Sequence, residues 1–113
     1  MTHDMKLRRE PFEKIKSGAK TMELRLYDEK RRTVSVGDEI RFACVDGDEP
    51  PLRRRVTALH VFSSFAELYA ALTLEKCGYS AEELESASPD DMNAYYSREE
   101  QSRFGVVGIE LAE

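Results

Sequence analysis

The sequence lacks long hydrophobic runs, paired cysteines and any surplus of glycine or proline, and each absence excludes a class of protein. No window approaches roughly 18 consecutive apolar residues, so we expect no membrane-spanning helix. The first residues contain no apolar stretch of the kind that a secretory signal requires. Only 6 glycines and 4 prolines occur among 113 residues, which excludes collagen-like and low-complexity chains. Cys44 and Cys77 are isolated, so we expect reduced thiols and a cytoplasmic protein.

What remains is the composition of an ordinary globular domain, with 41% hydrophobic and 35% charged residues. A chain of this length has room for one domain, residues 1–113. The net charge of −5 argues against a generally cationic, nucleic-acid-binding surface. However, residues 1–55 carry 14 Lys and Arg against 11 Asp and Glu, whereas residues 56–113 carry 3 against 11. This contrast predicts either a polarised surface with one anion-attracting side or a solvated surface of mixed charge.

The hydrophobic pattern predicts short strands, one early helix and a helical insertion before the last strand. The expected strands lie at residues 5–9, 20–27, 40–44, 53–62 and 106–111. The expected helices lie at residues 11–17, from Ser64 to Gly78, after Ser80, at residues 92–95 and after Ser97. Residues 28–33 form a charged loop in this interpretation. The order of elements indicates an α+β fold, a small and mainly antiparallel barrel or curled sheet with helices on one side.

The familiar catalytic and metal-binding motifs are absent from the sequence. Neither His3 nor His60 lies near a cysteine at a zinc-ligand spacing. No glycine-rich phosphate-binding loop and no GxSxG nucleophile elbow occurs. Acidic pairs such as Asp90-Asp91 are typical of the first turns of helices. We therefore expect neither a metal nor an organic cofactor.

The segment from Gly18 to Arg25 is the most informative part of the chain. A helix-closing glycine is followed by Lys20, and Glu23 and Arg25 share the polar face of the next strand with Thr21. If that face lines a cleft, Lys20 and Arg25 offer donors to a phosphate or carbonyl, and Glu23 orients them or accepts from an amino group. The alternative is an ordinary surface strand with alternating charges.

This segment resembles the signature GxKxxExR of the ASCH family, the activating signal cointegrator homology domains. The matching residues are Gly18, Lys20, Glu23 and Arg25. The flanking residues 26–32 and 36–38 and the tail at residues 95–97 and 104–109 also resemble small bacterial members, so the similarity spans about residues 5–111. The resemblance implies a PUA-like β-barrel, a cleft beside the signature and a role in RNA binding.

Some relatives in the wider family are enzymes, and the resemblance raises that alternative. One branch looks like amidohydrolases that deacylate N4-acetylcytidine with a lysine, a threonine nucleophile and a glutamate. Lys20 matches the lysine, but Glu23 occupies the position of the threonine, and Thr21 lies two residues too early to replace it. Ribonuclease activity has also been attached to ASCH proteins; Lys20 could then stabilise a phosphorane and Glu23 act as general base.

Further candidates surround the signature. Tyr27 is expected either to stack on a base or to lie at the rim, and the basic runs Lys30-Arg31-Arg32 and Arg53-Arg54-Arg55 are candidate phosphate contacts. Of Tyr95 and Tyr96, one is expected in the core and the other on the cleft wall. His3 is expected near the cleft.

Our first hypothesis is a domain that binds RNA or a nucleotide through Lys20, Glu23, Arg25 and Tyr27, with Arg31 and Arg32 beside them. The alternatives are a hydrolase acting on RNA or a modified nucleoside, and a regulatory module whose acidic second half binds a protein partner. The sequence does not decide the ligand, the oligomeric state or whether the helical insertion acts as a lid.

Overall fold

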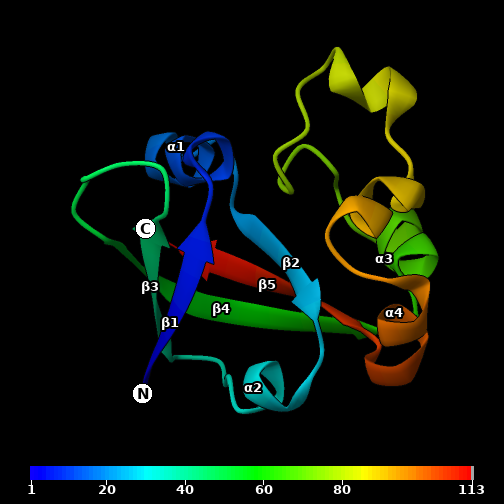
Figure 1. Cartoon of the computed structure of the whole chain (residues 1–113), viewed down its shortest axis with the longest axis horizontal. Helices are drawn as coiled ribbons and strands as arrows, with labels where there is room; N and C mark the ends of the chain where they lie inside the picture. The colour runs from blue at the N-terminus through cyan, green and yellow to red at the C-terminus, as the bar shows by residue number, and fades with distance from the viewer. Residues whose placement is uncertain (113) are drawn as a thin grey trace.

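Five segments with alternating apolar residues form one curled sheet in the computed structural model, which describes residues 1–112 (Figure 1). The strands are β1 (Thr2–Leu7), β2 (Met22–Leu26), β3 (Glu39–Cys44), β4 (Leu52–Phe62) and β5 (Val106–Ala112). Their order in the sheet is β1-β3-β4-β5-β2. The β1–β3 pair is parallel and the other three pairs are antiparallel. The expected α+β fold is confirmed, as a mixed half-barrel.

The first strand begins and ends earlier than the predicted residues 5–9. His3, Met5 and Leu7 face inward in the register that pairs β1 with β3. The chain then enters helix α1 (Arg9–Ser17) at Arg9, whose backbone N–H donates to Asp46 Oδ2 at 3.0 Å. This cap comes from the distant β3–β4 loop, which explains why local sequence did not reveal it.

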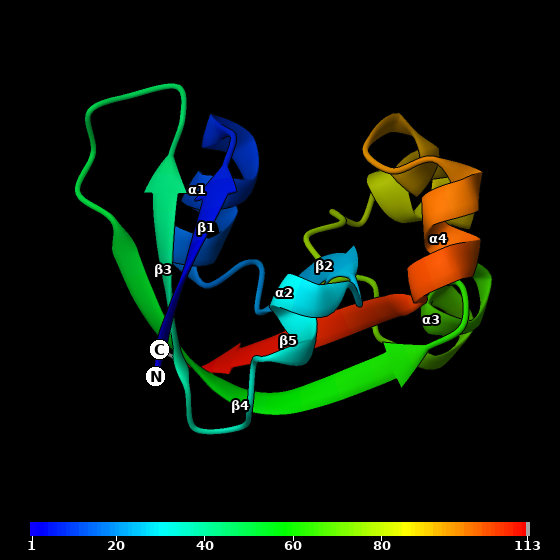
Figure 2. The ribbon, with the colours of Figure 1, turned by 60° about the horizontal axis from the view of Figure 1, so that its bottom comes forward.

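Two hydrophobic cores share the sheet. The first fills the barrel and is built from β1, β3 and α1, with Phe12, Ile40 and Phe42 fully buried. The second lies between β2 and the helices that follow β4, and contains Phe65, Leu68 and Val106. The long strands β4 and β5 extend from the barrel to the helical insertion (Figure 2), and β5 contributes residues to both cores. Burial on both sides of β5 follows from this arrangement.

The helical insertion before β5 is confirmed, but its helices are shorter than predicted. Helix α3 (Phe65–Ala71) begins at the Ser64 cap and ends seven residues before Gly78. The chain leaves the helix because Lys76 O accepts hydrogen bonds from Thr21 N (2.8 Å) and Met22 N (2.9 Å) beside β2. Two 3-10 helices, η1 (Glu83–Ser86) and η2 (Pro89–Ala94), precede helix α4 (Arg98–Phe104). Figures 1 and 2 both place this insertion opposite α1.

The predicted loop at residues 28–33 is instead a helical turn, α2 (Glu29–Arg32). Asp28 caps it by accepting from the backbone N–H of Arg31 at 3.1 Å, a cap that the charge-rich sequence concealed. No helix formed by residues 1–112 has the length and apolarity needed to cross a membrane.

Candidate functional site

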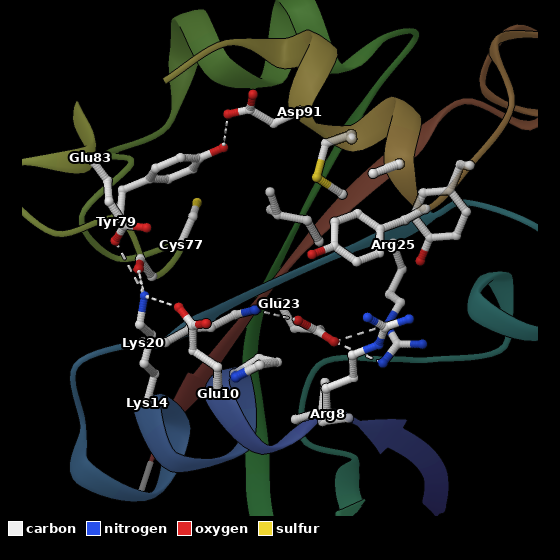
Figure 3. Close-up of a pocket in the computed structure, with 18 of the residues that line it drawn as sticks. Arg8, Glu10, Lys14, Lys20, Glu23, Arg25, Cys77, Tyr79, Glu83 and Asp91 are labelled. Carbon is white, nitrogen blue, oxygen red and sulfur yellow. Dashed lines mark hydrogen bonds and ion pairs between the residues drawn. The ribbon is translucent and has the colours of Figure 1, made fainter. Parts of the chain in front are cut away.

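A pocket of about 590 Å³ opens between the barrel and the helical insertion. Its barrel side is formed by the end of β1, the start of α1 and β2, and its other side by residues 69–96. The polar residues that line it are Lys6, Arg8, Glu10, Lys14, Lys20, Glu23, Arg25, Tyr69, Cys77, Tyr79, Glu83, Asp91, Tyr95 and Tyr96. The structure thus brings Lys20, Glu23 and Arg25 of the signature together in one concave site (Figure 3).

Glu23 lies at the floor of the pocket between two cations. Its Oε1 is 2.8 Å from Lys20 Nζ, and its Oε2 is 2.8 Å from Arg25 Nη2 and 2.9 Å from Arg25 Nε. Glu23 is only 3% exposed. A buried carboxylate requires such partners, because an unpaired charge away from water is costly. We name this cluster the Lys20–Glu23–Arg25 triad.

The triad is ionised and carries one net positive charge. Burial raises the pKa of Glu23, but the charges of Lys20 and Arg25 outweigh burial and hold that pKa below its ordinary value of 4.5. Burial lowers the pKa of Arg25, but the negative charge of Glu23 outweighs burial, so the pKa of Arg25 is raised above its ordinary value. The floor therefore presents hydrogen-bond donors to an anionic or carbonyl oxygen.

Arg25 also joins the two edge strands of the half-barrel. Its Nη2 donates to the backbone carbonyl of Lys6 at 3.0 Å, from β2 to β1. These strands lie at opposite edges of the sheet and share no ladder. The guanidinium therefore bridges the open seam of the barrel, and the pocket lies beside that seam.

Local backbone structure explains how Lys20 reaches the site. Gly18 ends α1 in the left-handed region, at φ 86°, where its backbone N–H donates to Ile15 O. The backbone N–H of Lys20 then donates to Lys14 O at 3.0 Å. A side chain on Gly78 would crowd Lys20, because an added Cβ would lie 3.2 Å from Lys20 Cδ. The helix stop thus directs Lys20 into the pocket.

Four tyrosines form the aromatic part of the pocket. Tyr96 is half-buried and stacks on Phe65, with ring centroids 6.2 Å apart, whereas Tyr95 is exposed at the rim. Tyr79 donates to Asp91 Oδ2 at 2.9 Å, and its hydroxyl lies 2.7 Å from that of Tyr69. Burial raises the pKa of Tyr69, Tyr79 and Tyr96, so their hydroxyls stay protonated. These polar rings suit a planar ligand.

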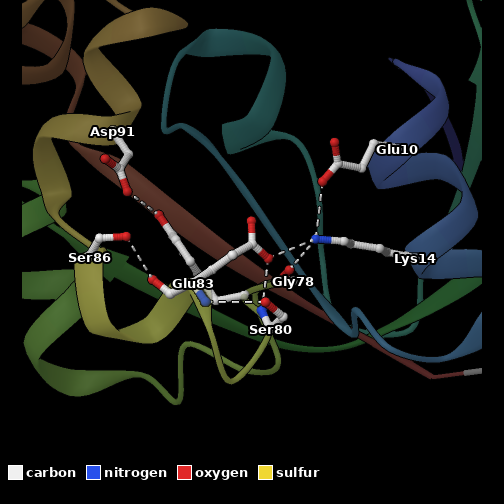
Figure 4. A network of polar contacts seen from close by, with 8 residues as sticks. Glu10, Lys14, Gly78, Ser80, Glu83, Ser86 and Asp91 are labelled. Atoms are coloured by element: carbon white, nitrogen blue, oxygen red, sulfur yellow. Dashed lines mark hydrogen bonds and ion pairs between the residues drawn. The ribbon is translucent and has the colours of Figure 1, made fainter.

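Lys14 fastens the insertion to α1 at one end of the pocket (Figure 4). Its Nζ donates to Gly78 O at 2.6 Å and lies 3.4 Å from Glu83 Oε1 and 3.3 Å from Glu10 Oε1. Glu83 also accepts from the backbone N–H of Ser80 at 2.9 Å. This contact to Ser80 is the largest influence that lowers the pKa of Glu83, with Lys14 adding to it. The insertion is therefore connected to α1 across the pocket.

The sequence did not indicate three cations of the pocket, Lys14, Lys6 and Arg8, and the last two differ from the other cations in their pairing. Lys6 and Arg8 are exposed, and no carboxylate among residues 1–112 pairs with either of them. By contrast, Lys14, Lys20 and Arg25 are all paired with carboxylates. The signal in the sequence was the alternation of β1, which turns Lys6 away from the core side of Met5 and Leu7.

Several predicted site residues lie outside this pocket. Tyr27 packs against the barrel core. The guanidinium of Arg32 lies over its ring, with Arg32 Cζ 4.4 Å from the ring centroid of Tyr27. Arg31 pairs with Asp28 at 3.1 Å. The residues singled out in the sequence that do not line the pocket are Tyr27, Lys30, Arg31, Arg32, Arg53, Arg54, Arg55, His3 and His60.

The expectation that His3 approaches the cleft is wrong. His3 is buried at the start of β1, and its Nε2 lies 2.8 Å from Asp38 Oδ2. The contact with His3 is the largest influence that lowers the pKa of Asp38, to about 2. His3 fastens β1 to the turn before β3 and serves the fold.

The pocket offers few groups for covalent or metal chemistry. Burial raises the pKa of Cys77 to about 11, so its thiol is protonated at neutral pH. Among residues 1–112, neither a serine nor a threonine lines the pocket. Within that same part of the chain, no group of three or more His, Cys, Asp or Glu side chains is placed to hold a metal ion.

Comparison with known proteins places this chain near two solved structures. The family model of the ASCH domain matches residues 5–113. The crystal structure of hypothetical protein PH0355 is 35% identical, with a TM-score of 0.79 over 98% of this chain and 97% of that one. The solution structure of protein PF0455 from Pyrococcus furiosus is 37% identical, with a TM-score of 0.68 over 98% and 96%. Comparison with curated proteins finds no match.

Proposed function

The chain belongs to the ASCH domain family, and from that premise we propose that it binds a ribonucleotide unit, within RNA or as a free nucleotide. The half-barrel is consistent with the PUA-like architecture of that resemblance. The proposed binding site is the pocket of about 590 Å³, a volume typical of small-molecule sites, which span roughly 300–1,000 Å³.

The triad is the observation that carries this proposal. A buried ion cluster costs free energy unless it is well paired, and its net positive charge at the floor of a pocket favours an anionic or carbonyl ligand. Both oxygens of Glu23 already accept from Lys20 or Arg25. Glu23 therefore supports the proposal as the residue that orients the two donors, and Lys20 and Arg25 contact the ligand. Tyr96 and Tyr79 supply faces for a base.

Hydrolysis is the weaker proposal for this pocket. Glu23 occupies the position at which the related amidohydrolases have their threonine nucleophile. Its lowered pKa makes it a poor general base. The other candidate nucleophile, Cys77, is a protonated thiol. We therefore expect bound ligands, including N4-acetylcytidine, to be recovered unchanged by chromatography; turnover abolished by Lys20→Met would favour the hydrolase.

Titration of wild type with labelled single-stranded RNA and with nucleoside monophosphates tests the proposal. Lys20→Met keeps the length of the side chain but removes the donor, and the expected loss of affinity is about tenfold or more. Lys16→Met is the matched control, because Lys16 is exposed on α1 and does not line the pocket. Thermal melts confirm that each variant is folded. Failure of every ligand to bind, or equal affinity of wild type and Lys20→Met, would contradict the proposal.

A further inference from the structure

We propose that the pocket takes one free nucleotide at a time, with its phosphate at Lys6 and Arg8 and its base toward Tyr79 and Asp91, and that it does not accept an RNA strand. This inference rests on the proposed function and selects between its two sources of ligand. It also assigns a direction to the ligand in the pocket. Four observations carry it.

The first observation is the pairing of the cations. Five cations line the pocket, and three of them are already paired with carboxylates. Lys6 and Arg8 are exposed and form no ion pair within residues 1–112. A phosphate binds most favourably to unpaired cations, because no existing ion pair has to be broken. Both lie on the barrel side of the pocket, and Figure 3 shows Arg8 at the edge remote from Asp91.

The second observation is the charge of the facing wall. Residues 73–100 contain eight carboxylates and two cations. The members of this segment that line the pocket include Glu83 and Asp91 and no cation. A polyanionic strand that entered the pocket would pass along this acidic wall and be repelled. A ligand with one phosphate at the opposite edge avoids that repulsion.

The third observation is the absence of a basic track beyond the pocket. The runs Lys30-Arg31-Arg32 and Arg53-Arg54-Arg55 do not line it. Arg31 and Arg53 are paired with Asp28 and Glu39, and Arg32 covers Tyr27. Single-strand binding requires cations that follow successive phosphates. The described residues offer two unpaired cations at the pocket, enough for one phosphate.

The fourth observation is the carboxylate of Asp91 at the end of the pocket opposite Arg8. Asp91 Oδ2 accepts from Tyr79 and from the backbone N–H of Ser88. Within residues 1–112, both hydrogen bonds to this carboxylate go to Oδ2, and Oδ1 has no partner. A carboxylate accepts from an exocyclic amino group and repels a carbonyl oxygen. The base end therefore favours an amino-bearing base over its carbonyl counterpart.

Calorimetric titration with cytidine and cytidine 5′-monophosphate tests the position of the phosphate. In wild type we expect the monophosphate to bind about tenfold more tightly than the nucleoside. In Arg8→Met this ratio should fall close to one. Arg9→Met is the matched control, since Arg9 contacts Asp46 and Glu49 and lies outside the pocket. Equal losses for both ligands in Arg8→Met would overturn the assignment of the phosphate.

Salt dependence distinguishes the free nucleotide from RNA. For the monophosphate, we expect log Kd to change with log salt concentration by a slope of about one or less. An octameric cytidine RNA should bind no more tightly than the monophosphate. An octamer that binds at least tenfold more tightly, with a slope of about three or more, would overturn this inference and leave the proposed function standing. If no ribonucleotide ligand binds, the proposed function itself fails.

Comparison of cytidine 5′-monophosphate with uridine 5′-monophosphate tests the direction of the base. The cytosine base carries an amino group where the uracil base carries a carbonyl oxygen. We expect wild type to prefer the cytidine nucleotide several-fold, and Asp91→Asn to reduce that preference. A preference of wild type for the uridine nucleotide would contradict the orientation.

Discussion

The two walls of the pocket are built and charged in opposite ways. The barrel wall contributes five cations and two carboxylates, carried by β1, α1, β2 and the short segments that join them. The insertion wall contributes two carboxylates and four tyrosines, and much of it consists of turns and two 3-10 helices. Only Cys77 and Met92 are buried between Thr73 and Ser97.

The two walls also differ in how strongly the fold supports them. β2 is paired with β5 along Met22–Leu26, and its apolar face packs in the second core, so Glu23 and Arg25 are held by ladder hydrogen bonds and packing. The insertion depends on helix caps and on a few polar contacts such as those of Lys14. Segments with few buried apolar contacts open at lower free energy. We expect charge recognition on the rigid wall and adaptation of shape on the insertion.

Removal of the Glu23 carboxylate should have the largest effect on the barrel wall. Glu23→Ala leaves two cations unpaired, one at each of its oxygens, and we expect the free energy of unfolding to fall by about 3–5 kcal/mol. Urea denaturation measures the loss. The control is Glu39→Ala, which breaks an exposed pair with Arg53 and should cost less than about 1 kcal/mol. Equal losses in the two variants would show that burial does not distinguish the triad.

Acid should weaken the same wall through Glu23. Its pKa in the folded protein lies below 4.5, so its stabilising contribution is complete above about pH 4.5 and is lost as the pH falls through the folded pKa. The difference in unfolding free energy between wild type and Glu23→Gln should therefore shrink as the pH falls below that value. For Asp38→Asn the corresponding difference should shrink between pH 3.8 and about 2. A difference for Glu23→Gln that did not change with pH would contradict the ionised triad.

A cap substitution should have the smallest effect, confined to the insertion. Ser97 Oγ accepts from the backbone N–H of Glu100 at 3.1 Å and caps α4. Ser97→Ala should cost about 1 kcal/mol. Hydrogen exchange should accelerate at residues 98–104 while β2 amides stay protected. Uniform acceleration over both walls would show that the insertion and the barrel open as one unit.

Much of the fold was predictable because each local signal also matched the tertiary structure. The period-2 patterns located β2 to β5, and Gly18, Ser64 and Ser97 marked helix ends correctly. Two boundaries were predicted wrongly, the start of α1 and the end of α3, because each depends on a contact with a residue distant in sequence. Asp46 starts α1 from another loop, and Lys76 O draws the chain out of α3. In both, a partner distant in sequence outweighed local propensity.

For the site, the sequence by itself determined which residues of the signature matter. A period-2 strand places Glu23 and Arg25 on one face, and the helix stop at Gly18 places Lys20 at the start of that strand. Only the tertiary structure decided that this polar face is buried, since burial depends on the insertion that packs over it. It also excluded Tyr27, Arg31 and Arg32 from the pocket and brought in Lys6 and Arg8. Curling of the sheet brings its two edge strands together across the seam, and no periodicity within one strand encodes that meeting.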